Sequence, residues 1–492
     1  MSLTWAMALL VLAPLAAAAL SFALPAIGRW LALATVAAVG SAVVRVAELV
    51  LGGGVQVHRV GGWSAPLGIN LRADGLAVLM LAITAIVGGV VTLYTPAYLA
   101  ANRSSPGQRQ RFWSPFLLLW TALDALFLSS DIFNLYVTLE LLALAAVTLV
   151  ALVGKRPALE AAMRYLFVSL AASLLYLLGV GLVYGQYATL DLALLAERSA
   201  TGGPTLWVAA SVMSGGLLAK AALFPMHFWL PPAHANAPAP VSALLSSLVV
   251  KGSFYILLRL WFEGFSGLMT PAAAQLFGAL GAAAILWGSL NALLAPRLKR
   301  LVAYSTVAQL GYLFLLVPLA AGPGDGFTAW SGGLIFLGAH ACAKAAMFLS
   351  AGNMLHAAGN DRIRDLDGVT HVLPLSAFSF GLSGMSLVGL PPSGGFAGKW
   401  LLLRAAIARG QWWWVATLLV GSLLAAAYVI RVLLHAFTRV EAPARHRPVP
   451  RVMEWTALGL AALAAGLGFA ASGSATLLRV GAPWPPAGVG RG

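Results

Sequence analysis

Long apolar runs dominate this 492-residue chain and constrain its fold more than any other feature. About fourteen of them are long enough to cross the hydrocarbon core of a bilayer as α-helices. They begin near Thr4, Trp30, Asp74, Ser114, Asp131, Met163, Pro204, Val241, Pro271, Leu298, Trp330, Val372, Trp412 and Trp455. Because 60% of the residues are hydrophobic and 9% are charged, little sequence remains for a soluble domain. We therefore expect an all-α polytopic membrane protein with about fourteen transmembrane helices.

Basic residues follow every second run, and this alternation predicts how the chain is oriented in the membrane. The net charge is +15, and its positive residues gather after the third, fifth, ninth, eleventh and thirteenth runs. These connections contain Arg103, Arg109, Arg111, Lys155, Arg156, Arg297, Lys299, Arg300, Arg362, Arg364, Arg439, Arg445, Arg447 and Arg451. Because Lys and Arg are enriched in cytoplasmic connections, both termini are expected outside the cell. The positive charge is thus explained by the bilayer, and no nucleic-acid partner is expected.

Four of the six lysines interrupt apolar runs, where an ionisable side chain is costly. They lie in SGGLLAKAALF, SSLVVKGSFYI, GAHACAKAAMF and GFAGKWLLL, as Lys220, Lys251, Lys344 and Lys399. The other two, Lys155 and Lys299, lie beside arginines in segments that we interpret as polar connections. A charge at membrane depth costs roughly 2.5–3.5 kcal/mol on insertion scales and usually marks an ion or proton path. Lysine suits proton transfer because, unlike arginine, it can lose its proton when buried.

Two further titratable residues lie within apolar runs and are expected to act with these lysines. Glu140 lies midway along the fifth run, and we predict that it pairs with Lys220. In a low-dielectric layer the two groups hold each other charged, so breaking the pair would release a proton toward Lys251. His340 lies four residues before Lys344, on the same helical face, and histidine titrates near neutral pH. The residues themselves therefore predict a proton relay of Glu140, Lys220, Lys251, His340, Lys344 and Lys399.

Structural roles are the alternatives for several titratable residues. A lysine at membrane depth can be half of a structural ion pair, and Lys399, which follows a loop-like pair of glycines, can extend to the membrane surface. His227 and His234 flank a proline-rich segment and are interpreted as capping or stiffening it. Interfacial or structural roles are expected for three carboxylates near the ends of runs: Asp74, Asp124 and Asp131.

Two proline-interrupted runs indicate an internal repeat. The seventh run meets FPMHFWLPP just after Lys220, and the twelfth meets GLPPSGGFAG just before Lys399. Paired breaks in two halves point to a transport site between inverted repeats, and the freed carbonyl groups can line a proton path. We expect N-terminal helices 1–3 with an extracellular loop in residues 1–113. Two inverted five-helix repeats follow in residues 114–262 and 263–438, and a C-terminal helix and tail in residues 439–492. Within the loop, residues 52–72 can form a small hairpin.

The sequence gives no indication of a cofactor or of a metal site. Cys342 is the single cysteine, so disulfides and iron–sulfur ligation within the chain are excluded. Nucleotide-binding and haem-binding motifs are not found, and the 16 tryptophans are typical of residues at membrane interfaces. We therefore expect no cofactor and no metal bound to this chain.

Five segments together resemble the proton-conducting antiporter-like subunits of Mrp-type cation/proton antiporters, respiratory NADH–quinone oxidoreductase and membrane-bound hydrogenases. In chain order they are DIFNLYVTLELL, KAALFPMHFWLPPAHANAPAPVSALLSSLVVKGSFYILLR, LKRLVAYSTVAQLGY, HACAKAAMF and GLPPSGGFAGKW. The resemblance covers about residues 74–434. It implies fourteen helices, inverted five-helix repeats and a central charged axis, which the motifs place at the same six residues. The first and last segments are most similar to the D-type subunits of Mrp antiporters, whereas HFWLPPAHANAP is closer to the respiratory and hydrogenase pattern.

The resemblance implies a proton-translocating subunit that works with other membrane subunits in a bacterial or archaeal plasma membrane. The leading interpretation is exchange of protons for a monovalent cation, with Na⁺ as the leading candidate. The chain would then be a subunit of a secondary transporter and not an enzyme. The alternative is a non-catalytic, proton-pumping subunit of a redox-driven complex of the NADH–quinone oxidoreductase or hydrogenase type. A structural scaffold with an inactive axis is the third interpretation, and the titratable residue at every axis position speaks against it.

Overall fold

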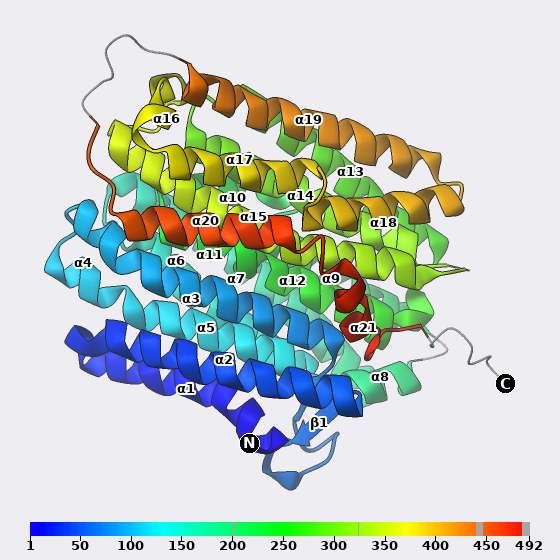
Figure 1. The fold of residues 1–492 in the computed structure, drawn as a ribbon. Helices are drawn as coiled ribbons and strands as arrows, with labels where there is room; N and C mark the ends of the chain where they lie inside the picture. The colour runs from blue at the N-terminus through cyan, green and yellow to red at the C-terminus, as the bar shows by residue number, and fades with distance from the viewer. Residues whose placement is uncertain (200–201, 323, 439–445, 485–492) are drawn as a thin grey trace.

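Long helices lie side by side in a single bundle (Figure 1). The computed structural model describes residues 1–199, 202–322, 324–438 and 446–484. Two of the basic residues used to orient the chain, Arg439 and Arg445, lie outside the described residues, as does the C-terminal end of the chain.

Residues 1–220, as far as the structure describes them, form nine α-helices and a two-stranded hairpin. The helices are α1 (Leu3–Ala23), α2 (Gly28–Gly53), α3 (Gly75–Ala101), α4 (Pro106–Arg111), α5 (Trp113–Leu128), α6 (Ile132–Ala151), α7 (Arg156–Tyr187), α8 (Leu192–Arg198) and α9 (Pro204–Lys220). The strands β1 (Gln56–Arg59) and β2 (Asn70–Ala73) pair antiparallel, with Gln56 opposite Ala73. The hairpin expected within residues 52–72 is therefore confirmed, with β2 ending one residue later.

After residue 220 the chain forms several short helices and then mostly long ones. They are α10 (Leu230–Asn236), α11 (Ala239–Leu244), α12 (Val250–Arg259), α13 (Pro271–Leu294), α14 (Leu298–Ala320), α15 (Gly326–Ala358), α16 (Val369–Val372), α17 (Pro374–Val388), α18 (Gly394–Ala408), α19 (Trp412–Phe437), α20 (Arg451–Gly466) and α21 (Ala471–Arg479). Two π-helical segments, η4 (Leu245–Val249) and η5 (Leu260–Gly264), lie directly before and after α12, so the three segments form one continuous helical stretch.

The helices confirm the predicted fold class. Within the described residues, eleven helices are long and apolar enough to cross a membrane, and they correspond to eleven of the fourteen apolar runs. The other three runs begin the interrupted helices α9, α17 and α20, the last of which is bent by 78° where α21 begins. The boundaries proposed for the repeats remain a prediction, and the one between residues 262 and 263 falls inside η5.

Both predicted proline breaks are present. Helix α9 ends at Lys220, and non-helical residues that include Pro225 separate it from the next helical turn. Helix α17 ends at Val388, and α18 begins only at Gly394, after Pro391 and Pro392. Proline supplies no N–H group and crowds the preceding turn, so each break leaves carbonyl groups of the preceding helix without intrahelical partners.

The two ends of the bundle are built differently. The hairpin, the N-terminus, α8 and α21 lie at one end, and α4 and α16 lie at the other (Figure 1). Two basic connections meet directly, because Arg297 and Arg362 form an isolated β-bridge. Arg103 and Lys155, from two other basic connections, line one cavity. The basic connections thus meet in pairs, as the alternation predicts, and the side of the membrane that they face remains a prediction.

The centre of the bundle is formed by the helical stretch from α11 to η5 and by α14 and α15. Nearly every residue of these three segments is buried, whereas only 33–39% of the most apolar stretch of α1, α2 and α19 is buried. Side chains of the outer helices face lipid, so their apolar surface needs no protein partner. The central helices therefore hold polar groups away from both lipid and water.

Glycines bring the backbones of α13 and α14 close together. A Cβ atom on Gly281 would lie 2.7 Å from the carbonyl oxygen of Gly311, and a Cβ on Gly311 would lie closer still to the carbonyl oxygen of Gly281. Helices in membranes associate by such close backbone packing, because lipid tails provide no hydrophobic driving force between them. Any larger residue at these two positions must separate the helices.

We expect Gly311→Leu to destabilise the protein by about 1–3 kcal/mol, as overpacking of an interior does. The matched control is Gly181→Leu on α7, where an added Cβ meets nothing within 4 Å. Thermal unfolding in detergent, followed by size-exclusion chromatography, should show a lower midpoint for the first variant only. Equal midpoints for the two variants would contradict the close approach of α13 and α14.

Candidate functional site

The predicted pair of Glu140 and Lys220 is present. Glu140 lies on α6 and Lys220 is the last residue of α9, and the Lys220 Nζ donates to the Glu140 Oε1 at 2.9 Å. The ammonium also donates to the Ser169 hydroxyl of α7 at 2.8 Å, and the Ser173 hydroxyl donates to the same carboxylate oxygen. The Lys220 side chain is 5% exposed and that of Glu140 is 18% exposed. The carboxylate therefore lies at the edge of the bundle and the ammonium faces inward.

Lys251 lies at the start of α12 and is completely buried. Its Nζ donates to the carbonyl oxygen of Ser246, 2.8 Å away in the π-helical segment η4. A π-helical turn disturbs the regular pattern of backbone hydrogen bonds and is frequent at functional sites. Here it places a backbone oxygen where it can accept from a buried ammonium.

Lys344 and His340 lie on one face of α15, the most buried long helix. The Lys344 Nζ donates to the carbonyl oxygen of Val302 at 3.0 Å and to the hydroxyl of Ser305, both on α14. His340 is 1% exposed, and neither of its ring nitrogens has a hydrogen-bond partner. The lysine charges that act on its ring are those of Lys251, Lys344 and Lys399. His340 thus lies among the three lysines that it was predicted to connect.

Lys399 is held at the break between α17 and α18. Its Nζ donates to the carbonyl oxygens of Leu387 at 2.7 Å and Val388 at 3.3 Å, the last two residues of α17. It also lies 3.9 Å from the centre of the Tyr312 ring, which attracts a cation through its π-electrons. The side chain does not extend to the surface, because Lys399 is 7% exposed. The proline break therefore provides acceptors for this ammonium, as predicted for the freed carbonyls.

Hydrogen bonds connect Lys251 to Lys344. The Ser246 hydroxyl lies 2.8 Å from the Thr306 hydroxyl, which donates to the Val302 carbonyl at 3.1 Å. That carbonyl is also the acceptor of Lys344, while the backbone oxygen of Ser246 is the acceptor of Lys251. Polar groups therefore link α12 to α15 through α14 in the middle of the bundle.

A small cavity lies between Lys220 and the helix that carries Lys251. Its volume is about 10 Å³, and its lining includes Lys220 and Ser169 on one side and Val249 and Ser253 on the other. This is close to the smallest space that holds one water molecule. A single water there would have the ammonium and two serine hydroxyls as polar neighbours.

Two titratable residues of the central region were given other roles from the sequence. Lys299 does not lie in a polar connection: it is in the first turn of α14, 5% exposed, and donates to the carbonyl oxygen of Ala237. His234 on α10 does not cap the break through its ring, because both ring nitrogens lack hydrogen-bond partners; the residue is completely buried and its ring stacks on that of Phe348, with the ring centres 4.6 Å apart. The charges acting on it are those of Lys299, Lys344 and Lys251. Prolines lie close to His234 and arginines lie close to Lys299, and both are typical of connections. The sequence therefore did not indicate that either residue is buried.

The remaining residues with expected structural roles divide into two kinds. Trp287 donates to His227 at 3.1 Å, which agrees with a stiffening role. Asp74 and Asp131 accept from backbone amides at the starts of α3 and α6, as expected for run ends. Asp124 differs, because it is completely buried within α5 and its carboxyl oxygens have no hydrogen-bond partner.

No group of three or more His, Cys, Asp or Glu side chains that could hold a metal ion occurs within the described residues. The site therefore consists of titratable side chains, hydroxyl groups and backbone oxygens. Groups of these kinds can accept, hold and pass on protons.

Comparisons with a protein family, with known relatives and with solved structures give the same classification. The family described as NADH:quinone oxidoreductase/Mrp antiporter, TM, matches residues 129–425. The chain is 37% identical over 424 residues to the N subunit of NADH-quinone oxidoreductase from Desulforudis audaxviator, covering 85% of this chain and 83% of that one. It is 30% identical over 412 residues to the D subunit of the Na⁺/H⁺ antiporter from Bacillus subtilis, covering 83% and 80%.

The fold is also similar to that of a chain in the Mrp complex from Dietzia sp.. The TM-score is 0.89 at 25% sequence identity, and the match covers 98% of this chain and 97% of the other. The similarity therefore extends beyond the residues matched by the family to nearly the whole bundle.

The ion pair makes a stability prediction that does not depend on activity. We expect Lys220→Met to destabilise the protein by up to about 3–5 kcal/mol, because it leaves the charge of Glu140 without its partner. The loss will be smaller to the extent that Glu140 reaches solvent, since it is 18% exposed. The double variant Lys220→Met/Glu140→Leu should recover most of the loss in a detergent unfolding assay. A double variant no more stable than the single one would show that the two charges do not depend on each other.

Proposed function

The chain belongs to the NADH:quinone oxidoreductase/Mrp antiporter transmembrane family, and we propose that it is the proton-translocating subunit of a membrane complex that exchanges protons for a monovalent cation, Na⁺ first. One observation carries the proposal. Six titratable side chains lie within the bundle, and five of them are less than a tenth exposed. An ion pair joins Glu140 to Lys220, and shared polar groups link Lys251 to Lys344. This charged axis consists of Glu140, Lys220, Lys251, His340, Lys344 and Lys399.

Proton movement begins at the Glu140–Lys220 pair. While the carboxylate lies 2.9 Å from the ammonium, each stabilises the charge of the other. Moving Glu140 away leaves the ammonium buried without its counter-charge, which favours release of its proton. The cavity of about 10 Å³ beside Lys220 supports a water-mediated step toward the helix of Lys251.

The second half of the axis passes the proton on through His340 and two lysines. Protonation of Lys251 adds a positive charge to the same buried region as His340 and Lys344, and like charges repel one another strongly where screening is weak. Lys399 is the terminal acceptor, because its ammonium is held by two backbone carbonyls and an aromatic ring and by no carboxylate. A proton can therefore reside there without an anionic partner.

The residues that lie between the axis and the basic end of the bundle provide a route to water. His234 and Lys299 are buried, His234 stacks on Phe348 one turn after Lys344 on α15, and Lys299 donates to the carbonyl oxygen of Ala237. Ala237 also lines a cavity of about 420 Å³ together with Arg103 and Lys155. Because the basic connections are expected in the cytoplasm, we assign this cavity to the cytoplasmic mouth of the proton path.

A redox-driven proton pump is the second candidate, and one comparison favours it. The relative with 37% identity over 85% of this chain is a subunit of NADH-quinone oxidoreductase. The same axis would then be driven by electron transfer in partner subunits, and this chain would be non-catalytic. The same site architecture can serve either energy source, so the identity of the partner chains decides between the two.

Neutralising either member of the pair should stop proton transfer. We expect Glu140→Gln and Lys220→Met to lower cation-driven proton flux by about 100-fold or more, as loss of a proton-transferring group does. Flux is measured in vesicles that contain the assembled complex, with a pH-sensitive dye inside. Glu160→Gln is the matched control, because Glu160 forms an exposed ion pair with Arg156 on α7. Near-normal flux in either pair variant at normal assembly would refute the proposed axis.

Purification in mild detergent distinguishes the two candidate functions. If the chain is part of an antiporter, small membrane proteins should co-purify with it and the preparation should lack flavin and iron–sulfur absorbance. Mass spectrometry identifies the partners, and visible spectra report the cofactors. Flavin-binding or iron–sulfur subunits in stoichiometric amounts would favour the redox-driven pump instead.

A further inference from the structure

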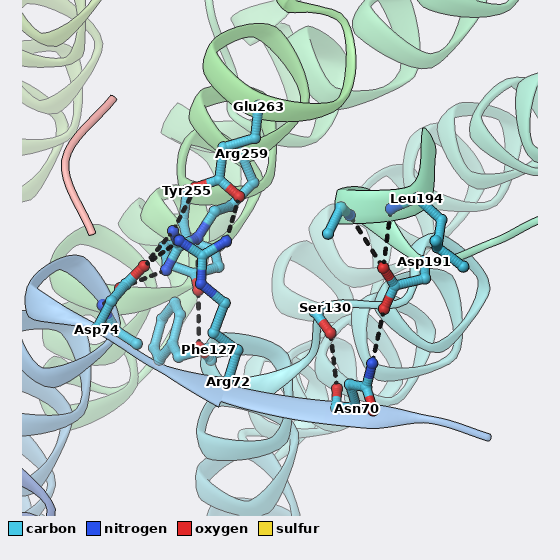
Figure 2. A network of polar contacts seen from close by, with 12 residues as sticks. Asn70, Arg72, Asp74, Phe127, Ser130, Asp191, Leu194, Tyr255, Arg259 and Glu263 are labelled. Atoms are coloured by element: carbon cyan, nitrogen blue, oxygen red, sulfur yellow. Dashed lines mark hydrogen bonds and ion pairs between the residues drawn. The ribbon is translucent and has the colours of Figure 1, made fainter. Parts of the chain in front are cut away.

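A second group of charged side chains lies at the end of the bundle that carries the hairpin (Figure 2). Two guanidinium groups and two carboxylates contact one another there. We call them the hairpin-end cluster: Arg72 of β2, Asp74 at the start of α3, Arg259 at the end of α12 and Glu263 in η5.

Arg259 is at the centre of the hairpin-end cluster. Its two terminal nitrogens donate to the two carboxylate oxygens of Asp74, each at 2.6 Å, and one of them also donates to Glu263 at 2.6 Å. Arg72 contacts the same two carboxylates, at 2.7 Å from Glu263 and 3.0 Å from Asp74. The Arg259 side chain is 4% exposed and that of Asp74 is 1% exposed. Paired, bidentate contacts of this kind are the strongest that a buried guanidinium can make.

Tyr255 extends the contacts of Arg259 to a third helix. The Nε of Arg259 donates to the Tyr255 hydroxyl at 3.0 Å, and this hydroxyl donates to the carbonyl oxygen of Phe127 at 2.7 Å (Figure 2). Phe127 belongs to the last turn of α5. The C-terminal part of α12 is therefore bound to both α3 and α5. Breaking these buried ionic contacts would be strongly destabilising.

Lys251 of the charged axis lies on this same helical segment. It is the second residue of α12 and Arg259 is the last, so the two are about 12 Å apart along the helix axis at 1.5 Å per residue. π-Helical turns bound α12 on both sides, at η4 and at η5. The α-helical segment between them is a short rigid unit, and the oxygen that holds Lys251 belongs to the adjoining π segment.

We propose that Arg259 is a positioning residue for Lys251. By fixing one end of α12 to Asp74 at the start of α3, Arg259 sets where the other end lies, and so keeps the Lys251 ammonium at the carbonyl oxygen of Ser246. The proposal rests on the proton-transfer function proposed for Lys251. It gives the hairpin-end cluster a role in that function although none of its members lies on the charged axis.

The test measures the pH dependence of cation-driven proton flux in vesicles that contain the assembled complex. We expect Arg259→Gln to lower the maximal flux by about 10-fold to 100-fold, as a displacement of about 1 Å at a reacting group can do. The pH of half-maximal flux should fall by about one unit, because a buried ammonium that loses its acceptor releases its proton more readily. Arg259→Lys, which keeps the charge, should recover part of both effects. Arg156→Gln, at an exposed ion pair, should change neither.

A second measurement reads the position of the helix without using activity. Hydrogen exchange of the amides in η4 should rise in Arg259→Gln, because release of one end of α12 loosens the other. An unchanged pH midpoint in correctly assembled complex, or exchange that rises only in η5, would overturn the proposal and leave Arg259 a local structural residue. If instead Lys251→Met retains full flux, the proton-transfer function itself fails, and this outcome is distinct from the first.

Discussion

A buried ammonium group needs oxygen atoms around it, and the rest of this structure follows from that requirement. Regular helices use nearly all of their carbonyl groups internally, so a bundle of unbroken helices has few acceptors to offer. The chain supplies them by interrupting or distorting helices beside the lysines. Lys251 binds a carbonyl in a π-helical segment, and Lys399 binds the carbonyls exposed where α17 ends. Lys344 shares the Val302 carbonyl with the side chain of Thr306. Lys220 has a carboxylate instead, in Glu140.

The sequence predicts those parts of the structure that depend on burial alone. A lysine within an apolar run needs a polar partner in a membrane, and a proline within a helical run interrupts the helix. The Glu140–Lys220 contact and both helix breaks were predicted on that basis. Lys299 and His234 were misjudged, because each lies at a helix end beside residues typical of connections, and their burial depends on how α10 packs against α14. The hairpin-end cluster was not predicted either. Asp74 and Arg259 are 185 residues apart in the sequence, and Arg72 and Glu263 are 191 residues apart. No local sequence pattern indicates contacts over such separations.

The relatives of this chain include a subunit of an NADH-quinone oxidoreductase and a subunit of a Na⁺/H⁺ antiporter, and the proposed axis is compatible with both kinds of complex. The proposed axis consists of Glu, Lys and His side chains, which do not themselves transfer electrons, and their hydrogen-bond partners include hydroxyl groups and backbone oxygens. A driving reaction therefore has to act on it mechanically or electrostatically. The edge position of Glu140, which is 18% exposed while its lysine partner is 5% exposed, makes this residue the accessible end for such an influence. A neighbouring protein that attracts or repels the carboxylate would act on the whole axis through it.

The composition of the charged axis also limits how much it can carry. It holds four lysines, one histidine and a single carboxylate, so protonation of all five bases beside the ionised carboxylate would place four uncompensated positive charges in a medium where charge is poorly screened. Each additional proton therefore raises the energy of those already present. If the axis carries protons as we propose, a proton that enters at one end repels those already present and favours the release of another at the far end. Occupancy would then remain nearly constant during turnover, and the number of protons that leave would be set by how often the pair at Glu140 opens.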